Sequence, residues 1–136
     1  MARYVTQIDS RLSQTDAFTY LADFSTARFW DPSVSEARRD GDGFELVSRF
    51  AGRDVPLRYR VVELDAPHRL VLEAARPSFV SRDTITCRAT ASGCLVDYDA
   101  RLIFGGAARV LDPVFQLVFN RVGAKASAGL QRELNP

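Results

Sequence analysis

Hydrophobic residues follow three successive patterns along the chain. Up to about residue 33, short apolar stretches are spaced as in one strand and two short helices. From Val34 to Phe104 apolar and polar residues alternate, and after Gly105-Gly106 the helical spacing returns and continues almost to the end. The chain therefore predicts a strand, two short helices, a run of strands and one long helix.

The first part predicts a strand over residues 4–9 and then a helix that Ser13 caps, with Asp16 three residues on. A second short helix is expected over residues 25–30. It ends there because Pro32 disfavours helical backbone at the residue before it.

The alternating part predicts six strands in consecutive hairpins, separated by turn clusters rich in Gly, Pro, Asp and Ser. Several runs exceed the usual strand length of about 5–6 residues, which indicates a strongly twisted and curved sheet. The strand around Leu70 to Ala74 is ambiguous, because it is apolar on both faces. In the other strands the alternation places these residues inward: Phe44, Leu46, Ser48, Phe50, Leu57, Tyr59, Val61, Ser81, Asp83, Ile85, Cys87, Val96, Tyr98, Ala100, Leu102 and Phe104.

The last hairpin also predicts a register. A two-residue turn at Ser92-Gly93 places Arg88 opposite Asp97 and Thr86 opposite Asp99, in agreement with the outward phase of both strands.

The same register separates the two cysteines. Cys87 then faces Tyr98 and Cys94 faces Ala91, which is too far apart for a disulfide. We therefore expect two buried, reduced thiols.

The C-terminal part predicts a long helix. Asp112-Pro113 is either an N-cap followed by proline at the first helical position or a kink in a helix that began earlier. Its apolar stripe is widened by Val114, Leu117 and Phe119 until little of that turn is polar. Such a helix is expected to be buried on most sides.

Composition limits the function classes. The chain has 136 residues and a formal net charge of +1, so we expect one domain over residues 1–136 and no overall field that attracts nucleic acid or an anionic membrane. No signal-peptide core or membrane-spanning run occurs, so a cytoplasmic protein without membrane insertion is expected. Basic residues are scattered arginines with Lys125 the only lysine, which is typical of a GC-rich bacterial genome. Cys and His residues are too few for a metal site of the usual spacing.

Three segments resemble the helix-grip domain of the START-like, or SRPBCC, superfamily. Residues 20–25 (YLADFS) with 30–34 (WDPSV) are similar to the "ladfs…W-x-P-x-v" segment of its polyketide cyclase/dehydrase-type members. Residues 93–98 (GCLVDY) are similar to their "G-T-x-V-x-Y" hairpin, with Cys94 in place of the usual Thr, and residues 111–130 resemble their last helix.

The resemblance covers essentially the whole chain and implies an α+β helix-grip fold. In this fold a curved antiparallel sheet of about seven strands, in the order β-α-α-β6-α, wraps around a long C-terminal helix. It also implies a cavity between sheet and helix for a lipid, a polyketide or another apolar small molecule, with no cofactor. Members include binding proteins and cyclases, so the fold does not decide the activity.

Two tyrosines and one aspartate are the polar side chains expected at this cavity. Tyr59 and Tyr98 carry hydroxyls that need a partner when buried. An inward Asp83 would have a raised pKa and could transfer protons. The alternative is an Asp83 at the rim of the sheet, solvated or paired with an arginine. We favour this alternative, because one carboxylate alone is weak evidence for a functional site. Trp30 either caps the cavity or packs the second helix. The full set of expected ligand-binding residues is Trp30, Phe44, Leu46, Ser48, Phe50, Leu57, Tyr59, Asp83, Ile85, Tyr98, Phe104, Phe115 and Phe119.

Three functional hypotheses follow. The first is a protein that binds a hydrophobic or aromatic small molecule. The second is a cyclase or aromatase-like enzyme that uses Asp83 with Tyr59 or Tyr98 for proton transfer. The third is an interaction module in which an exposed part of residues 114–119 docks on a partner or a second copy, so the chain is expected to be a monomer or a homodimer. His68 is expected on the surface, where no catalytic triad can form around it.

Overall fold

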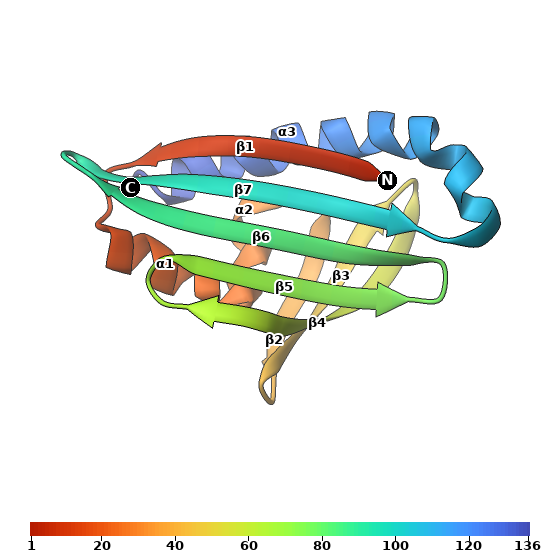
Figure 1. The fold of residues 1–136 in the computed structure, drawn as a ribbon, viewed down its shortest axis with the longest axis horizontal. Helices are drawn as coiled ribbons and strands as arrows, with labels where there is room; N and C mark the ends of the chain where they lie inside the picture. The colour runs from red at the N-terminus through yellow and green to blue at the C-terminus, as the bar shows by residue number, and fades with distance from the viewer.

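The computed structural model describes all of residues 1–136, and its elements follow the predicted order (Figure 1). Strand β1 (Ala2–Ser10) is followed by helix α1 (Gln14–Ala22), the 3-10 helix η1 (Phe24–Thr26) and helix α2 (Ala27–Trp30). A second 3-10 helix, η2 (Gly106–Leu111), leads into the long helix α3 (Asp112–Glu133). The six strands between α2 and η2 are β2 (Val34–Asp40), β3 (Gly43–Phe50), β4 (Arg53–Asp65), β5 (Arg69–Arg76), β6 (Phe79–Thr90) and β7 (Gly93–Phe104).

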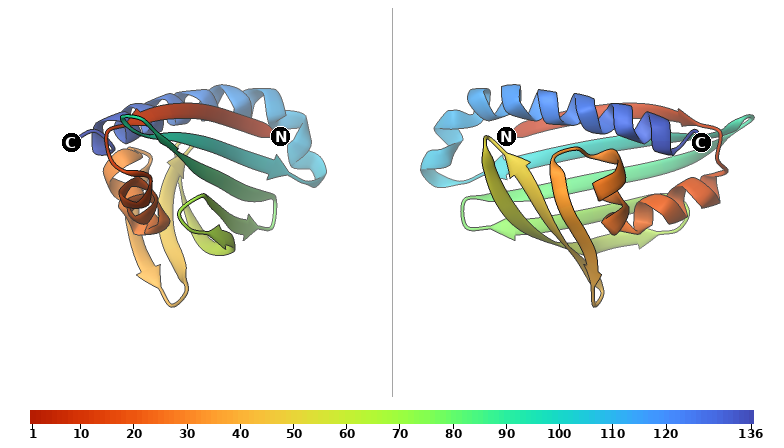
Figure 2. Two further views of the ribbon diagram at one scale, coloured as in Figure 1. Left: turned by 60° about the vertical axis from the view of Figure 1, so that its left-hand side comes forward. Right: turned by 180° about the vertical axis from the view of Figure 1, so that it is seen from behind.

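The seven strands form one antiparallel sheet in the order β1-β7-β6-β5-β4-β3-β2. Bulges between Val34 and Glu36 in β2 and between Val61 and Glu63 in β4 add to its twist. The sheet curls, and α3 runs along its concave side next to β1 (Figure 2). This is the predicted helix-grip fold.

The N-terminal helices form where the sequence predicts them. The Ser13 side chain accepts a hydrogen bond from the Asp16 amide at 3.1 Å and caps α1. The helix expected over residues 25–30 is split into η1 and α2, because the Asp23 side chain accepts from the Ser25 amide and tightens the first turn. Helix α2 ends at Trp30, as the following proline predicts.

The predicted register of the last hairpin is wrong by two residues. The turn lies at Ala91-Ser92, so Arg88 pairs with Leu95 and Thr86 with Asp97. A shift of two residues preserves the faces, which is why the inward and outward assignments still hold. The glycine has another role: a Cβ on Gly93 would lie 2.0 Å from the Ser10 carbonyl oxygen.

The cysteines follow the corrected register. Cys87 pairs with Val96 and Cys94 with Ala89, not with Tyr98 and Ala91 as predicted. Both are buried free thiols, as expected, and burial raises the pKa of Cys87 to about 12.

The ambiguous strand, β5, is buried on both faces. Leu70, Leu72 and Ala74 face the concave side, and outward-facing Val71 is also fully buried. The strand is apolar on both faces because both faces are buried.

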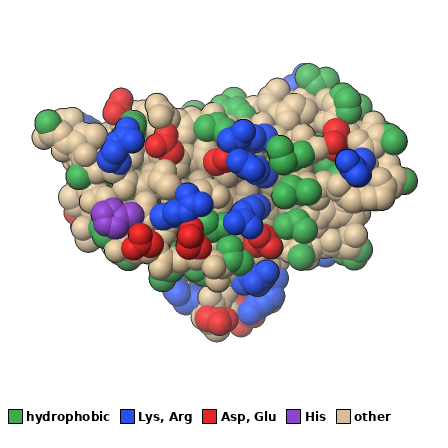
Figure 3. All heavy atoms as spheres, viewed as in Figure 1, with side chains coloured by type: hydrophobic (Ala, Val, Ile, Leu, Met, Phe, Trp, Pro, Cys, Tyr) green, Lys and Arg blue, Asp and Glu red, His purple; other side chains and the backbone are tan.

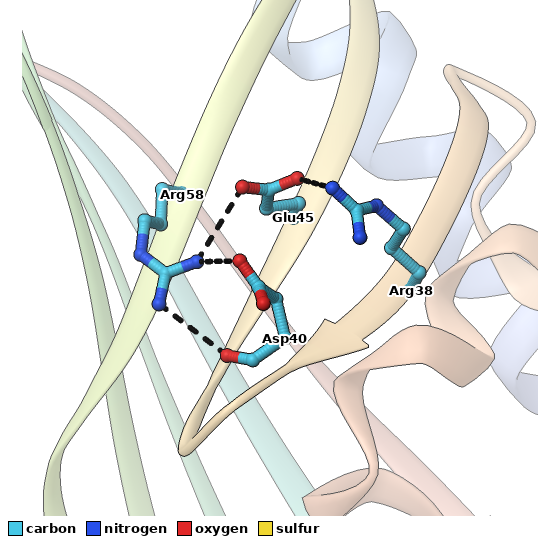
Figure 4. A network of polar contacts seen from close by, with 4 residues as sticks. All are labelled: Arg38, Asp40, Glu45 and Arg58. Carbon is cyan, nitrogen blue, oxygen red and sulfur yellow. Dashed lines mark hydrogen bonds and ion pairs between the residues drawn. The ribbon is translucent and has the colours of Figure 1, made fainter.

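The outer face of the sheet carries charges of both signs (Figure 3). On β2–β4, Arg58 donates to Asp40 at 2.7 Å and lies 3.5 Å from Glu45, which also pairs with Arg38 (Figure 4). Exposed pairs of this kind contribute little stability each. Their mixture of signs is typical of a solvated face.

Helix α3 departs from the prediction of burial on most sides. In α3, Val114 and Leu117 are 56% and 67% exposed and only Gly129 and Leu130 are fully buried, and Val110 in the preceding η2 is 80% exposed. The reason is its position: η2 and the start of α3 project past the ends of the strands, so the sheet covers only one side there (Figure 1).

The start of α3 also settles the alternatives at residues 112–113. Helical backbone begins earlier, as η2, and Leu111 rather than Asp112 occupies the N-cap position. None of the helices combines the length and the hydropathy that crossing a membrane requires.

Candidate functional site

A cavity of about 240 Å³ lies between the concave face of the sheet and α3. Small side chains on both walls leave this space open, among them Ala100 on β7 and Ala126 and Ser127 on α3. The helix approaches β1 closely here, because a Cβ on Gly123 would lie 2.3 Å from the Tyr4 ring. Most of the residues expected from sequence line this cavity: Trp30, Ser48, Phe50, Leu57, Tyr59, Asp83, Tyr98, Phe104, Phe115 and Phe119.

Three of the expected residues lie in the packed core instead. Phe44, Leu46 and Ile85 are buried but do not line the cavity. The end of the sheet near α1 and α2 is filled by core side chains, and Phe24 meets Phe44 edge-on with ring centroids 6.3 Å apart. Alternation identifies the inward face of a strand, but not the point along it where core gives way to cavity.

Half-buried phenylalanines surround the other end of the cavity, and we call them the phenylalanine cluster: Phe50, Phe79, Phe104, Phe115 and Phe119. Phe104 stacks on Phe115 with centroids 4.4 Å apart, and Phe50 lies 5.9 Å from Phe115. Because these rings are partly exposed while the polar residues farther in are buried, the cluster marks the open end.

Asp83 lies inside the cavity and not at the rim of the sheet, so the favoured expectation of a solvated or arginine-paired carboxylate is wrong. Its side chain is 7% exposed, and its Oδ2 accepts a hydrogen bond from the Tyr98 hydroxyl at 2.7 Å. Burial raises the pKa of Asp83 to about 7, although the bond from Tyr98 opposes this shift and the charge of Asp31 adds to it.

The second buried tyrosine has a separate partner. The hydroxyl of Tyr59 lies 2.8 Å from Ser81 Oγ on β6. Burial raises the pKa of both Tyr59 and Tyr98 well above the ordinary tyrosine value, so both are protonated at neutral pH.

Asp31 is a cavity residue that the sequence does not identify as one. It follows Trp30 at the end of α2, and its Oδ1 accepts from the Ser33 amide at 2.9 Å and the Ser33 hydroxyl at 2.7 Å. Ser33 in turn lies 3.2 Å from the inward hydroxyl of Ser48. Burial raises the pKa of Asp31. The only sequence feature that could have identified Asp31 is the family-like motif at residues 30–34, and there Asp31 is interpreted only as the residue before a proline.

Trp30 is buried and lines the cavity away from its open end. Its ring packs edge-on against Tyr98 at 5.6 Å and lines the cavity, while the absence of a side chain on Gly129 lets α3 approach the Trp30 carbonyl. Its indole nitrogen is buried and has no hydrogen-bond partner.

The titratable side chains of the molecule are dispersed. No group of three or more His, Cys, Asp or Glu side chains is placed to hold a metal ion. His68 is exposed and lies 3.2 Å from Gln14, on the outside of the molecule. The cavity offers an apolar, aromatic wall on which the Tyr59 and Tyr98 hydroxyls, several serine hydroxyls, the Trp30 indole N–H and two carboxyl groups are placed.

Comparisons with known families agree with this description. The profile of the family described as "Polyketide cyclase / dehydrase and lipid transport" matches residues 1–135. No curated protein sequence matches the chain.

Solved structures share the fold at low sequence identity. A START superfamily protein from Mycobacterium smegmatis is 11% identical with a TM-score of 0.75, over 98% of this chain and 95% of that one. A protein from Thermobifida fusca is 26% identical with a TM-score of 0.61, over 98% and 93%. The di-domain ARO/CYC StfQ from the steffimycin biosynthetic pathway is 17% identical with a TM-score of 0.70; the match covers 96% of this chain and 48% of StfQ.

Proposed function

We propose that this chain, which belongs to the polyketide cyclase / dehydrase and lipid transport family, binds a small hydrophobic or aromatic molecule inside the cavity between its sheet and α3. The cavity itself carries the proposal: apolar walls enclose it, and a few polar groups converge on it, as in small-molecule sites generally. Burial of the ligand's apolar surface, at about 25 cal/mol per Å², supplies affinity, and the polar groups orient it.

The size of the cavity limits the ligand. A dry cavity of about 150 Å³ is enough for benzene. By proportion, 240 Å³ holds about ten carbon atoms, which corresponds to two fused aromatic rings or a short, folded chain. Ligands much larger than a substituted naphthalene would need the phenylalanine cluster to move.

A matched pair of substitutions on α3 tests the proposal. Ala126→Phe places a ring in the cavity, whereas Ala124→Phe places the same ring on the exposed side of the helix. Calorimetric titration with 2-naphthylmethanol should show at least tenfold weaker binding to Ala126→Phe and unchanged binding to Ala124→Phe. Equal affinities in the two variants, or no uptake by the unsubstituted chain, would refute the proposal.

Proton transfer by Asp83 is a second candidate function, and its specific support is the 2.7 Å bond to Tyr98 together with a pKa of about 7. A base that titrates near neutral pH is matched to general acid–base catalysis. In an aldol closure, the Asp83 carboxylate would take the proton from the carbon next to one carbonyl. That carbon would attack a second carbonyl, whose oxygen would receive the proton of the Tyr98 hydroxyl. The protonated Asp83 would then return the abstracted proton to Tyr98 along the hydrogen bond that joins them.

Turnover of a short β-polyketone separates this enzyme from a binding protein. Asp83→Asn should abolish cyclisation and leave 2-naphthylmethanol binding intact. Turnover that is unchanged in this variant would remove Asp83 from the mechanism, and absence of turnover in the unsubstituted chain would leave the binding function alone.

A further inference from the structure

We propose that the cavity selects aromatic ligands whose polar end donates hydrogen bonds, an alcohol or a protonated amine, and discriminates against ligands that carry a carboxylate. This inference rests on the proposed binding function and narrows its ligand class. Three observations support it. Two carboxyl groups face the same cavity, each has one oxygen without a donor in the protein, and no basic side chain lines the cavity.

Each carboxyl group uses only one oxygen within the protein. Oδ2 of Asp83 accepts from Tyr98, and Oδ1 of Asp31 accepts from Ser33. The other oxygen of each has no donor in the protein, and neither residue belongs to an ion pair. The cavity therefore offers two acceptors that a ligand's N–H or O–H groups can satisfy.

No positive charge balances these carboxyl groups. Arginine, lysine and histidine are absent from the cavity lining, and the arginines paired with carboxylates lie on exposed parts of the molecule. The donors of the cavity, the Trp30 indole N–H and the tyrosine and serine hydroxyls, are neutral. An anionic ligand would therefore lose its hydration, meet no basic side chain and lie beside two carboxyl groups, which is unfavourable in a low-dielectric site.

The remaining walls tolerate a cation. Trp30, Tyr59 and Tyr98 line the cavity together with the two carboxyl groups, and aromatic faces attract ammonium groups electrostatically. An ammonium group can also donate three hydrogen bonds, which suits the free oxygens of Asp31 and Asp83.

The charge of the cavity depends on pH. The groups that act on Asp83 are Tyr98 from β7, Asp31 from the end of α2 and Asp99 from the outer face, and Tyr59 lines the same cavity from β4. The α3 side chains that line the cavity carry no titratable group. Asp83 itself ionises at about pH 7, so the cavity becomes more negative as the pH rises from 6 to 8.

Three ligands of nearly the same size test the proposal by calorimetric titration: 2-naphthylmethylamine, 2-naphthylmethanol and 2-naphthoate. At pH 8 the amine should bind at least tenfold more tightly than the acid. Between pH 8 and pH 6 its affinity should fall by about tenfold, because binding of the cation then has to displace the Asp83 proton, while the affinity of the acid should rise.

Isosteric variants assign the effect to the two carboxyl groups. Asp31→Asn and Asp83→Asn should each reduce the preference for amine over acid, and far-UV circular dichroism checks that each variant is folded. The proposal fails if the acid binds as tightly as the amine, or if the preference survives in both variants. Failure of all three ligands to bind the unsubstituted chain would instead refute the binding function on which it rests.

Discussion

Asp83 links the cavity to the stability of the whole chain. Its pKa is about 7 in the folded state and near 3.8 in an unfolded chain, so between these values only the folded state holds the proton. The stability that this proton contributes is complete below about pH 4 and is lost as the pH rises through 7. Above pH 7 the chain is therefore expected to carry a free-energy cost at the proposed ligand site.

Asp83→Asn should remove this pH dependence, because the amide does not titrate and still accepts a hydrogen bond from Tyr98. We expect the free energy of unfolding of the variant to gain about 2–3 kcal/mol relative to the unsubstituted chain between pH 5 and pH 8. Urea unfolding of both chains at pH 5 and at pH 8 measures this gain. Subtracting the free energy of unfolding of one chain from that of the other cancels the contribution of the other titratable groups. A difference that stays constant with pH would show that Asp83 titrates normally.

Tyr98→Phe should raise the pKa of Asp83 further, since the tyrosine hydroxyl stabilises the carboxylate. Carbon-detected NMR titration of the Asp83 carboxyl group follows this directly. Tyr59→Phe is the matched control, because the Tyr59 hydroxyl is paired with Ser81 and not with Asp83. Equal shifts in the two variants would contradict the specific role of Tyr98.

At the level of elements, the position of α3 depends on glycines that allow close approach. A Cβ on Gly129 would lie 1.9 Å from the Trp30 carbonyl oxygen, which is backbone and cannot rotate away. Gly105 precedes η2, where its φ is negative and a Cβ would meet no other atom within 4 Å. Gly105 is therefore a matched control for Gly129: the same substitution meets close packing at one position and open space at the other.

Gly129→Ala should destabilise the chain by about 1–3 kcal/mol or more, despite the better helix propensity of alanine, because α3 must shift away from α2. Gly105→Ala should change the melting temperature little. Thermal unfolding of the two variants measures the difference, and a Gly129→Ala chain as stable as Gly105→Ala would contradict the close packing of α3 on Trp30.

Elements could be predicted from sequence to the extent that their signals are local. The switch of period from helical to alternating and back predicts their order, and the Ser13 cap predicts where α1 begins. The register of β6 and β7 could not be predicted in the same way. The glycine at position 93 resembles a turn residue, but it is required by the backbone of Ser10, which lies far away in the sequence.

The candidate site shows the same limit at the level of the whole molecule. The inward faces of the strands indicate which side chains can meet a ligand, but only the packing of α1 and α2 decides that Phe44 and Ile85 belong to the core. Asp31 lines the cavity because α2 packs against both α3 and β2, and no periodic pattern in the sequence predicts that packing. Nor does the composition of α3 indicate that its first turns project beyond the sheet and leave Val114 and Leu117 exposed.

The exposed apolar side chains of η2 and the start of α3 provide an internal control for binding inside the cavity, because an apolar probe could also adsorb to them. The most direct measurement is a set of intermolecular NOEs between bound 2-naphthylmethanol and the side chains of the protein. We predict NOEs to the Ala100 and Ala126 methyl groups and the Tyr98 ring, and none to Val110, Val114 or Leu117. NOEs to those three exposed side chains in place of the cavity residues would contradict an internal binding site.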